Sequence, residues 1–279
     1  MIVWETGLAT VAGLVALASA SVASAGGQQA RGRHAHKTLS GDVENQVIGP
    51  LQVSGWFRAI ETKKGTRIRN LTIQGVTATD LQRDGIRIRG DVDGVNIRDF
   101  RLQMRGEPQS PPNLPIGIAV QTGHGITISD GNISGFQMVR IKGKYTNGDG
   151  IASERPVDGL TIRRVVSTDN SDGGFDLKSR NTDLDDLTSA RNGRNYRFWG
   201  TVEAGTLTSI DPRNAHIWVA KGARVHIRKL IARSTTKAPL LNIDGPSDVV
   251  IDSCELRLAP GTKLVVGGPR PKLGRGCAI

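Results

Sequence analysis

The chain has 279 residues, of which 37% are hydrophobic and only 4% aromatic, and its formal net charge is +11. The positive charge predicts an anionic partner, or it merely keeps the protein soluble. The scarcity of aromatic side chains, on which bases would stack, argues against a nucleic acid as that partner. Thirty-five glycines and no long apolar run after residue 25 favour short strands joined by tight turns.

Residues 1–25 are predicted to be a signal peptide, because 7–22 are almost wholly apolar or small and Ala23-Ser24-Ala25 fits a cleavage site. Glu5 stands where a positive charge is usual, so an uncleaved membrane anchor remains the alternative. The stretch is short for a membrane span. We therefore expect a secreted or periplasmic protein without stable membrane insertion after cleavage. Residues 26–37, which are polar and basic, are expected to form a disordered leader.

Residues 38–66 are expected to cap a repeat region that spans 67–266. In this region an apolar-polar-apolar triplet recurs about eight times, each copy followed by a turn rich in Gly, Asn or Asp. The triplets begin at Leu71, Val95, Ile126, Leu160, Leu187, Leu207, Val225 and Val249. The steps between them, from 18 to 34 residues, are typical of a solenoid.

Further β-type triplets lie between most of these copies. They begin at Ile86, Ile118, Val139, Phe175, Tyr196 and Ile217. Each period therefore holds at least two short strands, which pair in parallel with the equivalent strands of the next coil. The predicted fold is all-β, a right-handed parallel β-helix of about eight rungs that resembles the pectate-lyase superfamily.

Alternation within the second set of triplets predicts a basic strip on the outside of the solenoid. If the apolar residues face inward, several cations face outward on successive rungs. These are Arg87, Arg89, Arg140, Lys142, Lys178 and Arg197. An acidic polysaccharide is the partner that fits such a strip in an exported protein.

The densest chemistry lies between residues 147 and 199. Asp149 and Asp172 are separated by about one rung, and Asp176 shares an outward face with Lys178. Three converging carboxylates beside a lysine are what calcium and an acidic sugar would jointly require. The alternative is that Asp149 and Asp172 are turn residues and that Asp176 and Lys178 form a solvated pair.

The motif Asp172-Gly173-Gly174-Phe175-Asp176-Leu177, with an aspartate one rung earlier, resembles the calcium-dependent pectate lyases of the ninth polysaccharide-lyase family. This resemblance implies that Asp149, Asp172 and Asp176 bind calcium. Gly173 departs from the family pattern, which has a further aspartate there. The family's catalytic lysine has no clear match. Lys178 is the better-placed base from its position in the sequence, with Arg197 to stabilise the anion that forms.

A second resemblance is to the polygalacturonase hydrolases. Gly123-His124-Gly125 and Arg140-Ile141-Lys142 match two short motifs of that family. The carboxylate pair that an inverting hydrolase needs is missing from the preceding rungs. The first motif is therefore most simply a turn, and the hydrolase remains an alternative.

Substrate contacts are expected from cations in the same region and from one aromatic side chain that alternation sends outward. These residues are Arg140, Lys142, Arg191, Arg194 and Trp218. The predicted function is β-elimination of an acidic polysaccharide by a polyuronate lyase. The alternative from a different class is a non-catalytic β-helix that binds an anionic cell-surface polymer.

Cys254 and Cys277 are the only cysteines. In an exported chain they form one possible disulfide, which would help close the end of the solenoid. Two free thiols in a cytosolic protein are the alternative. Residues 267–279 are expected to be a tail.

Overall fold

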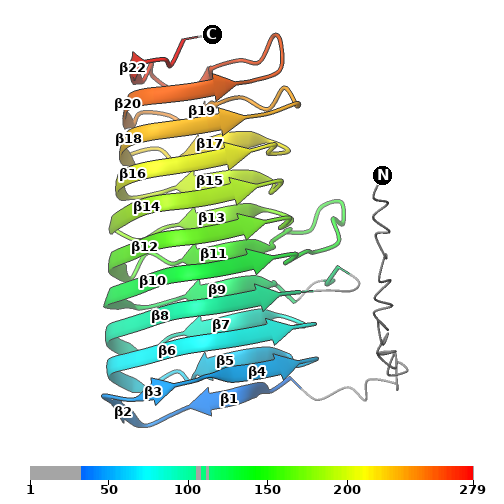
Figure 1. The fold of residues 1–279 in the computed structure, drawn as a ribbon, viewed down its shortest axis with the longest axis vertical. Helices are drawn as coiled ribbons and strands as arrows, with labels where there is room; N and C mark the ends of the chain where they lie inside the picture. Colours follow the sequence, from blue (N-terminus) through cyan, green and yellow to red (C-terminus); the bar gives the residue numbers. More distant parts are fainter. Residues whose placement is uncertain (1–32, 105–107, 111–112, 279) are drawn as a thin grey trace, which may run out of the picture. The chain divides into compact units, whose positions relative to one another are not determined.

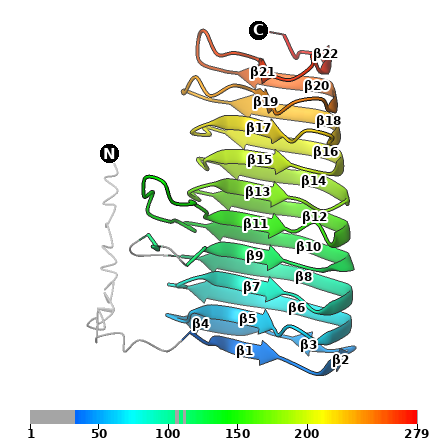
Figure 2. The ribbon, with the colours of Figure 1, turned by 180° about the vertical axis from the view of Figure 1, so that it is seen from behind.

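The computed structural model describes residues 33–104, 108–110 and 113–278, and the regular structure in these ranges is entirely β. The predicted signal peptide lies outside the described residues. Two parallel sheets stack coil upon coil into a β-solenoid of about ten turns (Figures 1 and 2). Across the described part of the chain, no helix has the length and apolarity to cross a membrane.

One sheet, here called the short sheet, has ten strands of up to five residues. In spatial order they are β1 (Ala35–Leu39), β5 (Arg58–Thr62), β7 (Asp84–Ile88), β9 (Ile116–Val120), β11 (Asp149–Ser153), β13 (Gly173–Leu177), β15 (Arg194–Phe198), β17 (Ala215–Val219), β19 (Leu241–Ile243) and β21 (Val265–Gly267). Each strand pairs in parallel with the equivalent strand of the next coil, so neighbours in space lie one coil apart in sequence.

The other sheet, here called the long sheet, has twelve strands, most of them ten to thirteen residues long. Its order is β2 (Asp42–Glu44), β6 (Arg67–Thr79), β8 (Asp91–Gln103), β10 (Gly123–Ser134), β12 (Val157–Thr168), β14 (Asn181–Ala190), β16 (Thr201–Ile210), β18 (Arg224–Arg233), β20 (Asp248–Arg257) and β22 (Lys272–Arg275). Two further short strands, β3 (Val47–Ile48) and β4 (Leu51–Ser54), both pair with β6. The predicted parallel β-helix is confirmed.

Inward side chains stack in columns along the core, as the alternation predicted. In the short sheet one column consists of buried Ile86, Ile118, Ile151, Phe175, Tyr196, Ile217 and Leu241. Its aromatic members stack, with 5.3 Å between the ring centroids of Phe175 and Tyr196. Hydrophobic burial in successive coils therefore holds the strands in register.

The uneven spacing of the sequence repeat has a structural cause. Leu187 pairs with Val165 rather than with Leu160, whose partner in β14 is Thr182. The triplet at Leu187 therefore belongs to a second inward column of the long sheet, and so does the one at Leu207. The residues that continue the column of Leu160 are Thr182, Val202 and Val225, and counted along them the coils after Leu160 are nearly equal in length. The two longer steps, of 31 and 34 residues, are coils that contain large loops.

The two ends of the solenoid use residues that the sequence suggested for caps and tails. β1 already pairs with β5, so the first coil includes residues expected in the leader and the cap. At the other end β22 pairs with β20. A disulfide joins Cys254 of β20 to Cys277, which confirms the predicted pairing. It links the segment after β22 to the preceding coil.

The triplet at Val139 is not a strand, and this prediction is wrong. Residues 135–148 form a loop between β10 and β11 that stands out from the stack (Figure 1). Val139 and Ile141 are each 41% exposed rather than buried. The loop is instead joined by backbone hydrogen bonds to Gln109, which lies between β8 and β9. Gln109 N donates to Gln137 O, and Val139 N donates to Gln109 O. An alternating pattern of only three residues is too short to predict a strand reliably.

Candidate active site

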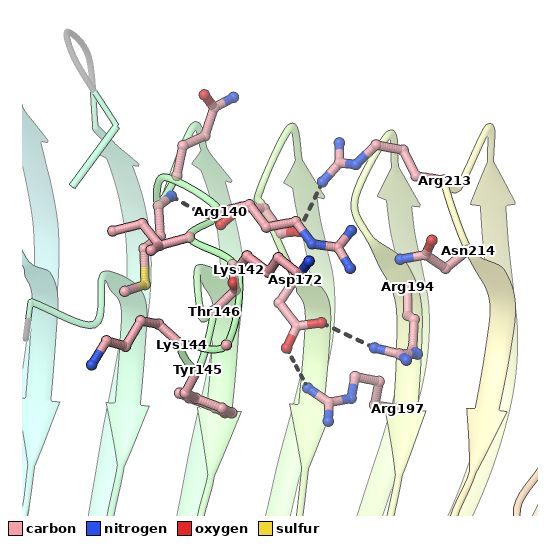
Figure 3. Close-up of a pocket in the computed structure, with 15 residues that line it drawn as sticks. Arg140, Lys142, Lys144, Tyr145, Thr146, Asp172, Arg194, Arg197, Arg213 and Asn214 are labelled. Atoms are coloured by element: carbon pink, nitrogen blue, oxygen red, sulfur yellow. Dashed lines mark hydrogen bonds and ion pairs between the residues drawn. The ribbon is translucent and has the colours of Figure 1, made fainter. Parts of the chain in front are cut away.

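The site lies on the outward face of the short sheet, where the loop over residues 135–148 forms a wall. The main cavity, of about 950 Å³, opens between this loop and strands β13 to β17 (Figure 3). Six cations and a single carboxylate, that of Asp172, line it. The cations are Arg140, Lys142, Lys144, Arg194, Arg197 and Arg213. A smaller side cavity of about 250 Å³ lies toward β7, and Tyr145 lines both cavities.

Asp149 is the first residue of β11 and is 1% exposed. Its Oδ1 accepts a hydrogen bond from Gly173 N at 2.6 Å. When the Asn147 amide is oriented to satisfy its neighbours, its nitrogen donates to Asp149 Oδ2 at 3.0 Å and to the Tyr145 hydroxyl at 3.2 Å. Burial, followed by the nearby carboxylates of Asp176 and Asp172, raises the pKa of Asp149 well above its ordinary value.

Gly173 explains why the chain departs here from the pectate-lyase pattern. Ile151 of β11 pairs with Phe175 of β13, and this register brings Gly173 level with Asp149. A Cβ at this position would lie 2.8 Å from Asp149 Oδ1. An aspartate would bring both a steric clash and a further negative charge to a carboxyl group that already lies beside two others. The glycine therefore leaves room for Asp149 to accept the backbone hydrogen bond.

Arg197, on β15, stands at the centre of the carboxylate cluster, which we define as Asp149, Asp172 and Asp176. Its Nη1 lies 2.8 Å from Asp172 Oδ2 and 3.4 Å from Asp176 Oδ2. Burial acts to lower the pKa of Arg197, but the three carboxylates outweigh it and raise the pKa. The guanidinium also lies 5.5 and 5.6 Å from the ring centroids of Trp199 and Trp218, a cation–π arrangement that fixes its position.

Asp176 is buried and anchors its neighbours rather than facing the main cavity. Trp199 Nε1 donates to its Oδ1 at 2.6 Å. Lys178 Nζ lies 3.6 Å from its Oδ2 and 3.1 Å from Glu154 Oε1. Burial acts to lower the pKa of Lys178, but Asp176 and Glu154 outweigh it and the pKa is raised. A raised pKa keeps the amine protonated, so the geometry does not favour Lys178 as a base, and that role stays a prediction.

The structure brings most of the predicted site residues together and separates the rest. Trp218 faces outward, as expected, and its ring centroid lies 4.6 Å from that of Trp199. Arg194 Nη1 lies 3.2 Å from Asp172 Oδ1, while Arg140 and Lys142 line the main cavity from the loop. The side chain of Arg191 instead pairs with Asp169 and does not line this cavity.

The continuous basic strip is also wrong as predicted. Arg87 and Arg197 do share one outward column of the short sheet, but other residues separate them. From β5 to β19 the column consists of Glu61, Arg87, Ala119, Ala152, Asp176, Arg197, Trp218 and Asn242. Most of the positive charge at the main cavity comes from the loop and from residues beside the column. The sequence repeat does not predict such positions.

The residues present do not fit a calcium site. Nowhere in residues 33–104, 108–110 and 113–278 are three or more His, Cys, Asp or Glu side chains arranged to hold a metal ion. The carboxylates do converge, but Arg197 supplies the positive charge between Asp172 and Asp176. Calcium therefore stays a prediction from the family resemblance, and no step below depends on it.

Neither a family model nor a curated protein matches this chain. Among solved structures, the periplasmic alginate epimerase AlgG aligns over 84% of this chain and 74% of its own, with 14% identity and a TM-score of 0.44. A mutant of AlgG aligns with a TM-score of 0.34 and 14% identity over 87% and 77% of the two chains. The Dettilon tailspike protein aligns with a TM-score of 0.36 and 12% identity over 86% of this chain and 55% of its own. At these values the likenesses carry no information on substrate or reaction.

The two motifs shared with polygalacturonases do not meet in space at this site. His124 lies at the start of β10 in the long sheet, where its Nδ1 is 3.1 Å from Asp93 Oδ1. Gly125 beside it has a positive φ of 63° and is skipped in the pairing with both neighbouring strands, so it interrupts the ladder within β10. Arg140 and Lys142 line the main cavity, whereas His124 lines a different one. Gly123, His124 and Gly125 all lie within strand β10, so the prediction that this motif is a turn is wrong.

Several residues of the site escaped the sequence analysis. Tyr145 and Lys144 lie in the loop, where no strand periodicity marks which residues face the cavity. Arg213 follows β16 and binds backbone carbonyls of Asn170, Ser171 and Arg191 at 2.5–3.0 Å. A signal was present only for Asn147, whose Asn-Gly-Asp-Gly context indicates a turn next to Asp149.

Proposed function

We propose that this protein binds an acidic polysaccharide along the short sheet and cleaves a glycosidic bond there by general acid–base catalysis, with Asp149 as the acid. The observation that carries this proposal is the environment of Asp149. Burial and the neighbouring carboxylates raise its pKa, so this carboxyl group keeps its proton to a higher pH than an ordinary aspartic acid does. Such a group can donate that proton to the oxygen of the leaving sugar.

Asp172 is the complementary carboxylate. Its two oxygens contact Arg194 and Arg197, and it lines the main cavity, whereas Asp149 lines the side cavity. Glycoside hydrolysis uses two carboxyl groups in unlike environments, one as acid and one as base. Asp149 and Asp172 differ in this way, and the two cavities they line share Tyr145. In this reaction Asp172 takes a proton from the attacking water, and Asp176 holds Arg197, Lys178 and Trp199 in place.

The acidic nature of the substrate is inferred from charge. The main cavity presents six cations around a single carboxylate. Arg140, Lys142 and Lys144 come from the loop, so the wall that a sugar chain would touch is strongly positive. The ring of Trp218 adds an apolar surface at one end of the cluster.

A polyuronate lyase is the second candidate, because the same cations suit the carboxylate of a uronic acid. Neutralisation of that carboxylate is the first requirement of β-elimination. The second requirement is an unprotonated base, and Lys178, whose pKa is raised, does not provide one. We therefore propose hydrolysis in preference to elimination.

The compartment is proposed to be oxidising, either secreted or periplasmic. The disulfide between Cys254 and Cys277 supports this, since such bonds persist mainly outside the cytosol.

The test is a product assay on a panel of polyuronates and neutral polysaccharides. We expect new reducing ends from an acidic polymer without ultraviolet absorbance, and a loss of roughly 10²–10⁴-fold in rate for Asp149→Asn. Asp130→Asn, which changes an exposed carboxylate on the long sheet, is the matched control. Ultraviolet-absorbing unsaturated products would establish elimination instead. Salt-sensitive retention of the polymer without any product would leave a non-catalytic binding protein.

A further inference from the structure

A second group of charged residues lies on the same face of the short sheet, at strands β5 and β7. Its centre is Asp84, the first residue of β7, which is completely buried. Arg58 Nε and Arg87 Nη2 lie 2.6 and 2.5 Å from Asp84 Oδ2, and Arg83 Nε lies 3.9 Å from the same atom. We define the arginine cluster as Arg58, Arg83 and Arg87. It is the reverse of the carboxylate cluster, since here several cations surround one carboxylate.

Positive charge exceeds negative charge in this group. Glu61 adds a second carboxylate, 3.4 Å from Arg58, and Arg89 adds a fourth guanidinium 3.9 Å from Glu61. Four arginines against two carboxylates leave a formal excess of +2. The side chains of Arg58 and Arg87 are buried, whereas those of Arg83 and Arg89 are partly exposed. A partly desolvated excess of positive charge favours the approach of an anion.

Hydrogen-bond donors in the cluster are also left without partners. The Nε atoms of Arg83 and Arg87 are both buried and have no hydrogen-bond partner. Arg87 as a whole is 8% exposed. Burial lowers the pKa of Arg87 to about 10, against the opposing effect of Asp84. Asp84 Oδ1 is likewise buried without a partner, so not every polar atom of the cluster is satisfied within it. The Nε atoms are enclosed, and an anion would meet the parts of Arg83 and Arg87 that line the side cavity.

The position of the cluster relates it to the proposed active site. Arg83 and Arg87 line one end of the side cavity, and Asp149 lines the same cavity from β11. Only β9 separates β7 from β11, so the two ends lie two strand spacings apart, roughly 10 Å. β9 contributes Ile116 and Ala119 to the lining, which gives the floor between the ends no charged side chain.

We propose that Arg83 and Arg87 form an anion subsite that holds a negatively charged substituent of the polysaccharide about two coils from Asp149. This inference rests on the proposed function and specifies the substrate. The polymer carries charge not only where it is cleaved but also on a sugar farther along the chain. A carboxylate and a sulfate ester share the chemistry that two guanidinium groups recognise.

The experiment measures binding and cleavage separately in the full chain. The probes are polygalacturonate, dextran sulfate and uncharged dextran at low salt. Arg83→Gln is the main variant, because its side chain is partly exposed and its Nε has no hydrogen-bond partner. Arg87→Lys is a second variant that keeps the charge but loses the planar fork. Arg163→Gln, an exposed arginine on the long sheet, is the matched control.

Arg83→Gln should weaken binding of the charged probe by roughly tenfold, the value of about one charge-assisted hydrogen bond, while Arg163→Gln changes it little. An effect on polygalacturonate alone assigns the subsite to carboxylates, and an effect on dextran sulfate alone assigns it to sulfates. Equal binding by Arg83→Gln and wild type would overturn the subsite, even if Asp149→Asn abolishes cleavage. Weaker binding by Arg83→Gln without any cleavage by wild type would support the subsite and remove the proposed function.

Discussion

Both sheets carry charged side chains, but these charges lie in very different surroundings. On the long sheet, Arg164 and Asp130 form an exposed pair with Nε and Oδ1 2.6 Å apart, and hydrogen bonding from Arg164 lowers the pKa of Asp130 to about 2. On the short sheet Asp149 is buried, and its pKa moves in the opposite direction. Strand geometry thus determines where a charged side chain lies, whereas its desolvation determines the direction in which its pKa shifts.

Loops create this difference. The loop over residues 135–148 forms hydrogen bonds with Gln109 and makes a wall of the main cavity, with Tyr145 beside the carboxylate cluster. The carboxylates at the foot of this wall lose water and depend on neighbouring charges. The following predictions test this contrast between buried and exposed charges.

The largest effect is expected on the pH dependence of catalysis. The pKa of Asp149 is raised in the folded protein, so its active, protonated form is present at low pH and lost as pH rises through that raised pKa. The rate of cleavage should therefore fall about tenfold for each pH unit above it. A pH–rate profile measures this.

Asp130→Asn, on the exposed face, should leave the profile unchanged. The same raised pKa predicts that folding stability also declines with rising pH, because the folded state then holds a proton that the unfolded state has released. A rate that increases with pH across the neutral range would contradict the role of Asp149 as acid.

The next effect is the loss of Arg197. Arg197→Gln leaves Asp172 and Asp176 without their shared cation in a buried setting, which should lower the free energy of unfolding by roughly 3 kcal/mol. Urea denaturation measures the change. Adding Asp172→Asn should restore part of the stability, since it removes one of the two carboxylates that Arg197 neutralised. No loss in the single variant would mean that the cluster remains hydrated.

Reduction of the disulfide should have a similar or slightly smaller effect. The bond between Cys254 and Cys277 closes a loop with a sequence separation of 23 residues, which predicts a stabilisation of about 3 kcal/mol. The Cys254→Ser, Cys277→Ser variant should unfold at lower urea concentration than wild type and should not respond to reductant. Cleavage should persist, because this end of the solenoid is distant in sequence from the carboxylate cluster.

These contrasts also show what the sequence predicts and what it does not. The inward columns followed from alternation, because Ile86, Ile118 and Ile217 leave no other way to bury their side chains. The pairing of Asp149 was missed by one residue: it stands opposite Gly173, and Asp172 lies just before β13. The length of the turn between two strands varies from coil to coil, so the spacing of residues in the sequence does not fix the register to within one residue.

The centre of the site was less predictable still. That Arg197 lies among three carboxylates depends on its reach and on the rings of Trp199 and Trp218, which hold it in place. Tyr145 and Lys144 line the cavity from the loop, where the sequence has no strand periodicity that would predict the direction of a side chain. Side chains from different coils meet there, and only the folded backbone brings them together.

The smallest effect should come from the exposed face. Lys229 Nζ lies only 2.6 Å from Glu255 Oε1, closer than Arg197 lies to either of its carboxylate partners, yet both side chains are largely in water. Solvent screening and the entropy of two long side chains offset the attraction, so Lys229→Ala should change stability by less than about 0.5 kcal/mol. Urea denaturation beside Arg197→Gln makes the comparison direct. If the two variants lost equal stability, distance rather than desolvation would determine the strength of ion pairs in this solenoid, and the contrast between its two faces would fail.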